Sequence, residues 1–222
     1  PKSTLFPYTT LFRSKHPAGN PSAKKKLYLF CDEFTNYNDT EIGIKAILLL
    51  EKLGYTVVIP PHEESGRAWM SKGLIRAAKK IANKNIASLS KLVTAETPLI
   101  GIEPSAILTF RDEYIDLADD ENLEAAKSLA KNVFLIDEFI AGEIELGNID
   151  RSVFTKEKRL IKLHGHCQQK ALSSLSASLK ILSFPENYRV ENIPSGCCGM
   201  AGSFGFEKEH YDLSMQIGEL VL

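Results

Sequence analysis

The sequence predicts an α/β protein made of two pseudo-repeated parallel βαβ halves, the second of them truncated at the C-terminus. Three observations support this class. Short apolar runs alternate with helical segments along most of the 222 residues, a pattern typical of parallel sheets with crossover helices. The order strand, helix, strand, glycine turn and helix occurs twice. Each copy opens with a strand that ends in a cysteine, Cys31 in the first half and Cys167 in the second.

The first half is expected over residues 27–118. The run KKKLYLFC predicts a buried strand that ends at Cys31. The segment NDTEIGIKAILLLEKLGY predicts a helix that Asp39 or Thr40 caps and Gly54 stops. TVVIP predicts a second strand, SKGLIRAAKKIANKNIASLSKLV a long amphipathic helix, and PLIGI a third strand.

Residues 119–160 are expected to form a helical connector, because an acidic helical pattern runs from 119 to 150. The second half is expected over 161–222. There RLIKLHGHC predicts a strand, QQKALSSLSASLKILS a helix and YRVENIP another strand, before a glycine turn opens a last helix. The strand GIEPSA of the first half has no counterpart in the second, so we expect a truncated repeat.

The two halves align as a divergent internal repeat. The turn ESGRAWMSKG of the first half corresponds to CCGMAGSFGF of the second, so that Gly66 aligns with Gly199. In this alignment Glu64 and Ser65 stand at the positions that Cys197 and Cys198 occupy in the second half.

The N-terminal segment 1–26 is expected to be artefactual or disordered. Its stretch TLFPYTTLFRS, from Thr4 to Ser14, resembles codon for codon the translation of a common sequencing-adapter oligonucleotide. A segment of that origin is not a targeting signal, and we expect the natural chain to continue upstream.

Composition narrows the class of protein. The formal net charge is −1, which gives no reason to expect nucleic acid as a partner. No apolar run approaches the roughly 20 residues of a membrane-spanning helix. Four cysteines are too few for a disulfide framework, and three of them cluster near the C-terminus. This clustering favours a reducing, cytoplasmic compartment and a metal or redox site.

The second half concentrates soft metal ligands where a site is expected. Sites in open parallel sheets form outside the carboxyl ends of the strands, and Cys167, Cys197 and Cys198 all follow predicted strand ends. Thiolates select zinc or iron–sulfur clusters. Gly196 and Gly199 permit unusual backbone angles and let amide groups approach bound sulfur atoms. The pattern therefore predicts a thiolate site for a bulky anionic centre.

Four segments carry a resemblance to a known family. LHGHCQQKAL, SGCCGMAGSFGFEKEHY, GIEPSAILTFRDEY and CDEFTNYNDTEIG resemble the cysteine-rich CCG domain. This module occurs in heterodisulfide reductases and in the iron–sulfur subunits of glycolate, lactate and glycerol-3-phosphate dehydrogenases. The likeness is strongest to the C-terminal part of FAD-linked D-2-hydroxyacid oxidases and covers roughly residues 25–222.

The resemblance implies a set of metal ligands. The family motif carries over onto Cys167, Cys197 and Cys198, with a further cysteine expected beyond Leu222. In the first half only Cys31 matches, because the later family cysteine is replaced by alanine in the sequence PSA. The first half thus resembles a repeat that has lost most ligand cysteines and kept its fold.

The same resemblance implies a function. The chain is expected to be an iron–sulfur electron-transfer module, a fragment of an FAD-linked oxidoreductase that oxidises a D-2-hydroxy acid of the lactate or glycolate type. The cofactor would be a 4Fe-4S cluster, cubane or non-cubane, with FAD only in the part of the protein that this chain lacks. The fragment alone is expected to be inactive.

Partners follow from the same relationship. We expect a flavin dehydrogenase domain or subunit, a ferredoxin-like iron–sulfur domain and a quinone or other electron acceptor. A quinone acceptor would bring this cytoplasmic protein to the inner face of a membrane.

Several candidate residues have two interpretations each. Cys31 is either a further metal ligand or a buried vestige. His166, beside Cys167, either contacts the cofactor or holds the turn structurally, as does His164. His210 is expected on a helix face rather than as a ligand. For His62, next to Glu63 and Glu64, a solvated loop is preferred over a metal site.

Three basic residues are further candidates for a functional role. Arg111, in the sequence RDEY, either holds a substrate carboxylate or makes a structural ion pair, and the structural role is preferred. Lys170 and Lys208 either balance the charge of a cofactor or lie on helix surfaces.

A function of another class remains open. Three thiolates and either His166 or His210 could make a closed four-ligand zinc site in an α/β binding module with no redox role. A third possibility is an interaction domain with inert cysteines.

Overall fold

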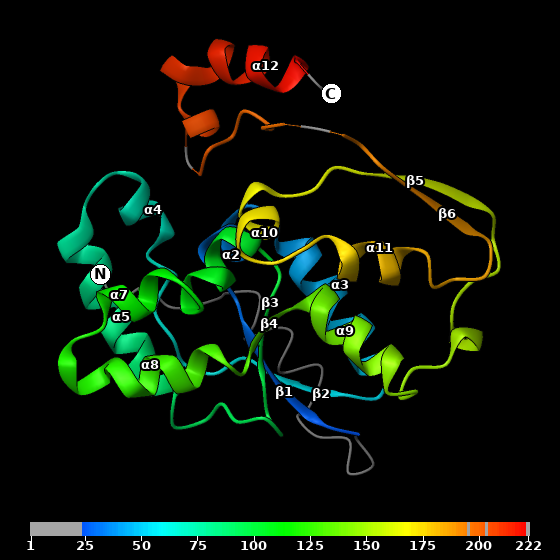
Figure 1. The fold of residues 1–222 in the computed structure, drawn as a ribbon, viewed down its shortest axis with the longest axis horizontal. Helices are drawn as coiled ribbons and strands as arrows, with labels where there is room; N and C mark the ends of the chain where they lie inside the picture. Colours follow the sequence, from blue (N-terminus) through cyan, green and yellow to red (C-terminus); the bar gives the residue numbers. More distant parts are fainter. Residues whose placement is uncertain (1–23, 195, 203, 221–222) are drawn as a thin grey trace.

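The computed structural model describes residues 24–194, 196–202 and 204–220 (Figure 1). The adapter-like stretch from Thr4 to Ser14 lies outside these residues, so the expectation for the N-terminal segment stays a prediction.

The main sheet has four parallel strands, which confirms the α/β class. β1 (Lys26–Phe30), β2 (Thr56–Val58), β3 (Leu99–Gly101) and β4 (Val133–Leu135) are arranged in the order β2-β1-β3-β4. Leu29 of β1 lies beside Ile100 of β3, which lies beside Phe134 of β4. Parallel neighbours need crossover connections, and helices supply them between each pair of strands.

The connector was predicted to be helical, but it also contains a strand. It holds α8 (Leu123–Ala130), β4 and α9 (Ile136–Glu145), preceded by the 3₁₀ turn η2 (Asp120–Asn122). Val133 and Leu135 are almost fully buried against the core. The three apolar residues of β4 continue the apolar pattern of the helices on both sides. Periodicity alone therefore could not distinguish this strand from a continuous helix.

The first half otherwise forms the predicted elements. α3 begins at Thr40, as expected, although the side chain of Asp39 makes no capping hydrogen bond. A short additional helix, absent from the sequence-based prediction, comes directly after β1, and the carboxylate of Asp32 caps it. The helices of this half are α2 (Glu33–Tyr37), α3 (Thr40–Lys52), α4 (Arg67–Ser71), α5 (Ile75–Leu89), α6 (Pro104–Ile107), η1 (Leu108–Phe110) and α7 (Glu113–Leu117).

The second half contains its own parallel pair of strands. β5 (Arg159–Leu163) and β6 (Tyr188–Asn192) form a separate two-stranded sheet after the turn η3 (Arg151–Val153). The single helix predicted between them is two helices, α10 (Cys167–Leu172) and α11 (Ser176–Leu182), because the backbone leaves helical angles at Ser173. Both halves therefore contain a parallel strand–helix–strand unit.

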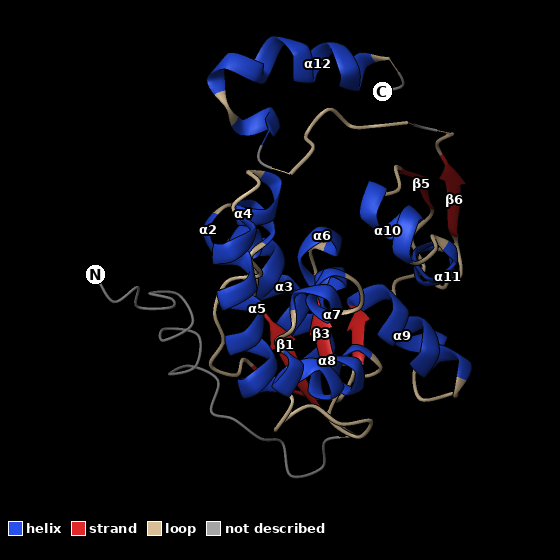
Figure 2. Ribbon diagram, turned by 60° about the vertical axis from the view of Figure 1, so that its left-hand side comes forward, coloured by secondary structure: helices blue, strands red, loops and turns tan. Residues whose placement is uncertain are grey.

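A segment of short helices follows β6. η4 (Phe204–Phe206), η5 (Lys208–His210) and α12 (Tyr211–Glu219) complete the described chain. Figure 2 shows this segment crossing from the β6 side of the molecule to the side of α4. There Lys72 forms an ion pair with Glu207. Within the residues that the structure describes, no helix combines the length and apolar character needed to cross a lipid bilayer.

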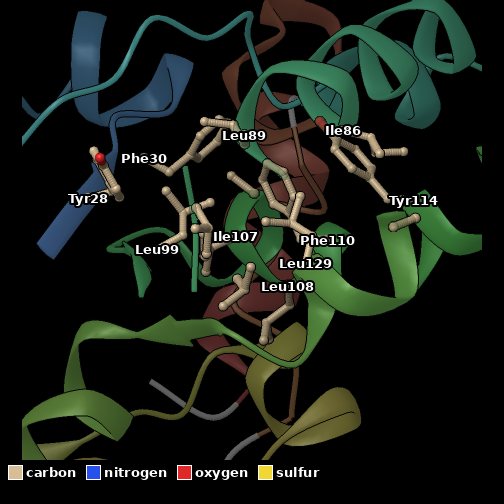
Figure 3. Close-up of a cluster of buried hydrophobic side chains, with 14 of the residues drawn as sticks. Tyr28, Phe30, Ile86, Leu89, Leu99, Ile107, Leu108, Phe110, Tyr114 and Leu129 are labelled. Atoms are coloured by element: carbon tan, nitrogen blue, oxygen red, sulfur yellow. The ribbon is translucent and has the colours of Figure 1, made fainter. Parts of the chain in front are cut away.

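Each face of the main sheet covers one hydrophobic cluster. Phe30 and Leu99 point to the side where Ile107, Phe110 and Tyr114 pack (Figure 3). On the other face a second cluster includes Leu27, Leu50, Tyr55, Ile100 and Phe139. Alternation along β1 and β3 produces these two sides, as expected for strands covered on both faces.

A buried polar network docks the second half onto the connector. The Gln169 side chain donates to Asp137 Oδ2 at 2.7 Å and to Ser178 Oγ at 2.9 Å. These residues come from α10, α9 and α11 and are less than a tenth exposed. The position of α10 relative to the main sheet is thus fixed by hydrogen bonds as well as by packing.

Candidate functional site

Cys167 begins a helix and does not end a strand, which corrects the sequence-based prediction. β5 ends at Leu163, and the turn HGH separates it from α10. His166 caps α10, since its Nδ1 accepts a hydrogen bond from the backbone N–H of Gln168 at 3.2 Å. The Cys167 side chain is exposed at the first turn of α10.

The CCG turn is held against α12. The backbone N–H of Gly199 donates to Cys197 Sγ at 3.3 Å, and Ser214 Oγ donates to the Gly199 carbonyl at 3.0 Å. Gly199 has φ of +86°, and a Cβ placed there would lie 2.1 Å from the Ser214 carbonyl oxygen. Glycine is required here both by backbone angle and by this close approach.

Cys167 and the CCG turn lie side by side. The pKa of the Cys167 thiol is raised by burial and then by the negative charges that Cys197 and Cys198 carry when ionised, with a hydrogen bond to Cys197 adding to this. Lys170 opposes the shift, and its Nζ lies 3.4 Å from the Gly196 carbonyl oxygen. Contacts between α10 and the turn thus bring the three thiols into one neighbourhood.

The side chains as placed are not a finished metal site. Among the described residues, no three His, Cys, Asp or Glu side chains lie close enough together to hold an ion. The chemistry of the donors nevertheless fits a soft centre, because Cys167 and Cys197 are exposed thiols and Cys198 is half-buried. Side-chain rotation at the exposed turn would be needed to point all three sulfur atoms at one ion.

Cys31 lies apart from this group. It directly follows β1 and is 5% exposed. Burial, reinforced by the neighbouring Asp32, raises the pKa of its thiol to about 12. The other three cysteines do not contribute to that shift. Cys31 is therefore a neutral thiol in the first half of the molecule.

Asp32 predicts a measurable pH dependence. Its buried carboxyl group caps α2, and burial raises its pKa to about 6, although hydrogen bonds from Thr35 oppose this. Because the folded state binds the proton more tightly than the unfolded state, this group stabilises the fold as pH falls from about 7 to about 4, by about 3 kcal/mol. Asp32→Asn should lose that contribution: urea unfolding across this range should show its stability falling relative to wild type at low pH.

A constant stability difference between Asp32→Asn and wild type across that range would contradict the prediction. Thr35→Val provides a matched control, because it removes the neighbouring hydroxyl and keeps the titrating carboxyl group.

Two of the candidate histidines, His166 and His210, lie close to acidic side chains. His166 Nε2 lies 3.3 Å from Glu103 Oε1, and burial lowers the pKa of His166. His210 Nδ1 lies 3.0 Å from Glu207 Oε2, with its ring stacked on Phe204, in agreement with the preferred helix-face interpretation.

For His62 the preferred interpretation of a solvated loop is wrong. The residue is 7% exposed, and its ring accepts the Cys31 backbone N–H at 3.3 Å. Its other nitrogen lies 2.6 Å from the Glu63 carbonyl oxygen, to which it donates.

His164 is different from the other histidines. Both of its ring nitrogens are shielded from solvent and have no hydrogen-bond partner among the described residues. The residue precedes His166 and Cys167 in the turn after β5, and its charge contributes to the lowered pKa of His166. It is the one histidine of this turn with free donor capacity within the described structure.

The remaining cations occupy structural positions. Arg111 donates to Glu138 Oε1 at 2.9 Å and to the Val133 carbonyl at 2.9 Å, which agrees with the preferred structural ion pair. Lys208 is exposed in η5.

The turn of the first half that aligns with CCG is closed by a carboxylate. Glu33 accepts hydrogen bonds from the Ser65 backbone N–H at 2.9 Å and from Ser65 Oγ at 2.6 Å. Gly66 has φ of +77°, as Gly199 has a positive φ in the second half. No pattern in the sequence indicated the Glu33–Ser65 contact. Acidic residues are common in the first turn of a helix, so the sequence Asp32–Glu33 is explained by a helix start alone.

Comparison with known proteins identifies dehydrogenases among the relatives. The chain is 31% identical over 190 residues to D-2-hydroxyglutarate dehydrogenase of Escherichia coli, which covers 85% of this chain and 18% of that enzyme. It is 25% identical over 221 residues to one subunit of the anaerobic glycerol-3-phosphate dehydrogenase of Escherichia coli, which covers 98% of this chain and 54% of that relative.

Lactate utilization protein A of Macrococcus caseolyticus is 25% identical over 185 residues, which covers 81% of this chain and 72% of that protein. No family model and no solved structure matches the chain. The chain spans 18% of the length of the Escherichia coli D-2-hydroxyglutarate dehydrogenase. Its similarity to these proteins relates the chain to oxidoreductases.

Proposed function

We propose that this chain is an iron–sulfur electron-transfer module of an oxidoreductase that oxidises a D-2-hydroxy acid. The observation that carries the proposal is the position of α10, which begins at Cys167, next to the CCG turn: Lys170 Nζ lies 3.4 Å from the Gly196 carbonyl oxygen. The similarity to a D-2-hydroxyglutarate dehydrogenase over most of the chain supports a D-2-hydroxy acid of that type as the substrate of the whole enzyme.

The proposed ligands are Cys167, Cys197 and Cys198. A 4Fe-4S cluster bound there would supply one-electron transfer. His164, three residues before Cys167 and with no hydrogen-bond partner for its ring nitrogens among the described residues, is a candidate for a further contact. Cys31 stays outside this set because it is 5% exposed and directly follows β1 in the first half of the chain.

The surrounding residues would position these ligands and moderate their charge. The Gly199 N–H already points at Cys197 Sγ, and amide donors of this kind shift the potential of iron–sulfur centres. Lys170 supplies a positive charge that favours the ionised Cys167. His166 and Glu103 hold the start of α10 beside α6.

The CCG turn of the second half is held by other groups than its counterpart in the first half. Alignment of Cys31 with Cys167 places Gln169 at the position of Glu33, but Gln169 donates to Asp137 and Ser178. In this turn Cys197 Sγ accepts the Gly199 N–H, and Ser214 Oγ donates to the Gly199 carbonyl.

The rest of the electron path belongs to the same proposal. A flavin domain or subunit would deliver electrons, and a ferredoxin-like domain with a quinone or another acceptor would receive them. The similarity to one subunit of a glycerol-3-phosphate dehydrogenase supports a role within a larger assembly.

Metal and sulfide analysis tests the proposal. The protein, purified without oxygen, should contain about four iron atoms and four acid-labile sulfides, with visible absorption. Cys197→Ser should lose most of both, while Cys31→Ser should retain them. Stoichiometric zinc without sulfide would overturn the electron-transfer role and support the zinc-stabilised binding module.

A further inference from the structure

The turn between α4 and α5 presents large apolar side chains to solvent at one edge of the molecule (Figure 1). Every residue of the stretch 71–76 is exposed. Leu74 is 51% exposed and Ile75 48%, and a Cβ placed at Gly73 would meet no described atom within 4 Å. Trp69, on α4, is 37% exposed. We call Trp69, Leu74 and Ile75 the apolar tip.

The segment that contains the apolar tip is strongly basic. Residues 67–95 hold seven lysines and arginines and no acidic residue, in a chain whose formal net charge is −1. Three of the seven form no ion pair with a described residue, and these are Arg76, Lys80 and Lys91. The other four pair with carboxylates of other segments, and these are Arg67, Lys72, Lys79 and Lys84.

The three unpaired cations lie on one face of α5 and its C-terminal extension. The buried positions of this helix are Ala78, Ala82, Asn85, Ile86 and Leu89. With about 3.6 residues per turn, Arg76, Lys80 and Lys91 fall on the opposite face, and all three are exposed. Arg76 directly follows the apolar tip in the chain, and Lys80 lies one turn further along α5. We call these three residues the basic row.

The combination of apolar and basic groups indicates the class of partner. Acidic side chains near the tip already have partners, since Glu64 accepts the Trp69 indole N–H and Glu207 pairs with Lys72. An acidic protein surface would complement the basic row but would leave the apolar tip in water. An anionic lipid surface complements both, because it offers phosphates to cations and an apolar layer to large side chains.

We propose that the apolar tip and the basic row dock on an anionic lipid surface. Leu74 and Ile75 enter the boundary of the acyl chains, and Trp69 lies at the level of the headgroups, where tryptophan is enriched. Arg76 and Lys80 contact lipid phosphates. This surface uses none of the clustered cysteines, so the proposal does not depend on the proposed electron transfer.

Co-sedimentation with lipid vesicles tests the proposal. The protein should bind vesicles made of equal parts phosphatidylglycerol and phosphatidylcholine, and should bind phosphatidylcholine vesicles much more weakly. Added sodium chloride should weaken binding, because salt screens the contacts between cations and phosphates. Trp69 is the single tryptophan of the chain, so its fluorescence should shift to shorter wavelength as the tip leaves water.

Removal of two cations tests the basic row. Arg76→Gln combined with Lys80→Gln should weaken binding to the anionic vesicles about 25-fold, roughly fivefold for each lost charge. Lys45→Gln combined with Lys52→Gln is the matched control. It removes the same charge from α3, where both lysines are exposed.

A polar substitution tests the apolar tip. Leu74→Gln should weaken vesicle binding about tenfold, because a large apolar side chain no longer enters the lipid. Leu146→Gln is the matched control, since Leu146 directly follows α9 and is 73% exposed. Ile75→Gln, at another exposed position, provides a second test of the tip if Leu74→Gln fails to fold.

Weaker binding in the Arg76 and Lys80 double variant and in Leu74→Gln, with both controls unchanged, would support the proposal. Equal binding to neutral vesicles, an equal loss in the control pair on α3, or an unshifted Trp69 emission on binding would each overturn it. Saturable binding of polyglutamate without binding to anionic vesicles would overturn it in favour of an acidic protein partner. Binding to neither would overturn the assignment of this surface to an anionic partner.

Discussion

Replacing Glu33 with alanine is expected to lower the free energy of unfolding by about 3 kcal/mol, because it leaves two buried donors without an acceptor. Ser65 is fully buried, and both its backbone N–H and its hydroxyl donate to Glu33. Urea denaturation, monitored by far-UV circular dichroism, measures the change.

Glu41→Ala is the matched control for this prediction. Glu41 is also a glutamate in the first turn of a helix, but its side chain is 83% exposed and forms an ion pair with Lys45. Surface pairs of this kind contribute roughly 0.5 kcal/mol or less. A loss in Glu33→Ala no greater than in Glu41→Ala would show that the Glu33–Ser65 contact does not hold the turn.

This contact holds the turn of the first half that aligns with the CCG turn of the second. Gly66 and Gly199 both have positive φ, so the backbone of the turn is similar in this respect in the two halves. The polar groups of the turn need partners in both cases. In the first half Glu33 supplies them, and the aligned Gln169 of the second half is occupied elsewhere.

The fold was predictable where the sequence signals were long or repeated. β1, α3 and α5 stand where their apolar patterns placed them, because each pattern matches a buried face of a strand or helix. β4 was not predictable, since three residues between two helices carry no period of their own. The break between α10 and α11 was also missed, because the serines around it do not forbid a continuous helix.

The candidate site was predictable only in its residue types. The CCG motif and a predicted strand end suggested Cys167, Cys197 and Cys198 as ligands, although Cys167 begins α10 and does not end β5. Burial of His62 depends on packing between the loop before α4 and Phe30, whose ring lies 4.4 Å from the imidazole. A contact between residues so far apart in the sequence leaves no local pattern to find.

Gly199→Ala is expected to detach α12 from the CCG turn. The added Cβ would lie 2.1 Å from the Ser214 carbonyl oxygen, a backbone atom that can move only with the helix. The hydrogen bond from Ser214 Oγ to the Gly199 carbonyl would be lost in the same movement. Hydrogen exchange should report faster exchange throughout α12, and iron and sulfide content should fall with it under the proposed function.

Gly147→Ala is the control for Gly199→Ala, because it tests the effect of the backbone angle without the steric clash. Gly147 has φ of +74°, close to that of Gly199, but a Cβ there meets nothing within 4 Å. Both variants therefore carry the left-handed backbone penalty of about 1 kcal/mol, and only Gly199→Ala adds the collision with α12. If both variants leave hydrogen exchange in α12 unchanged, the contact between helix and turn is not what holds this segment. Faster α12 exchange in Gly199→Ala alone, with unchanged iron and sulfide, would mean that the cysteines hold their ligand without the helix.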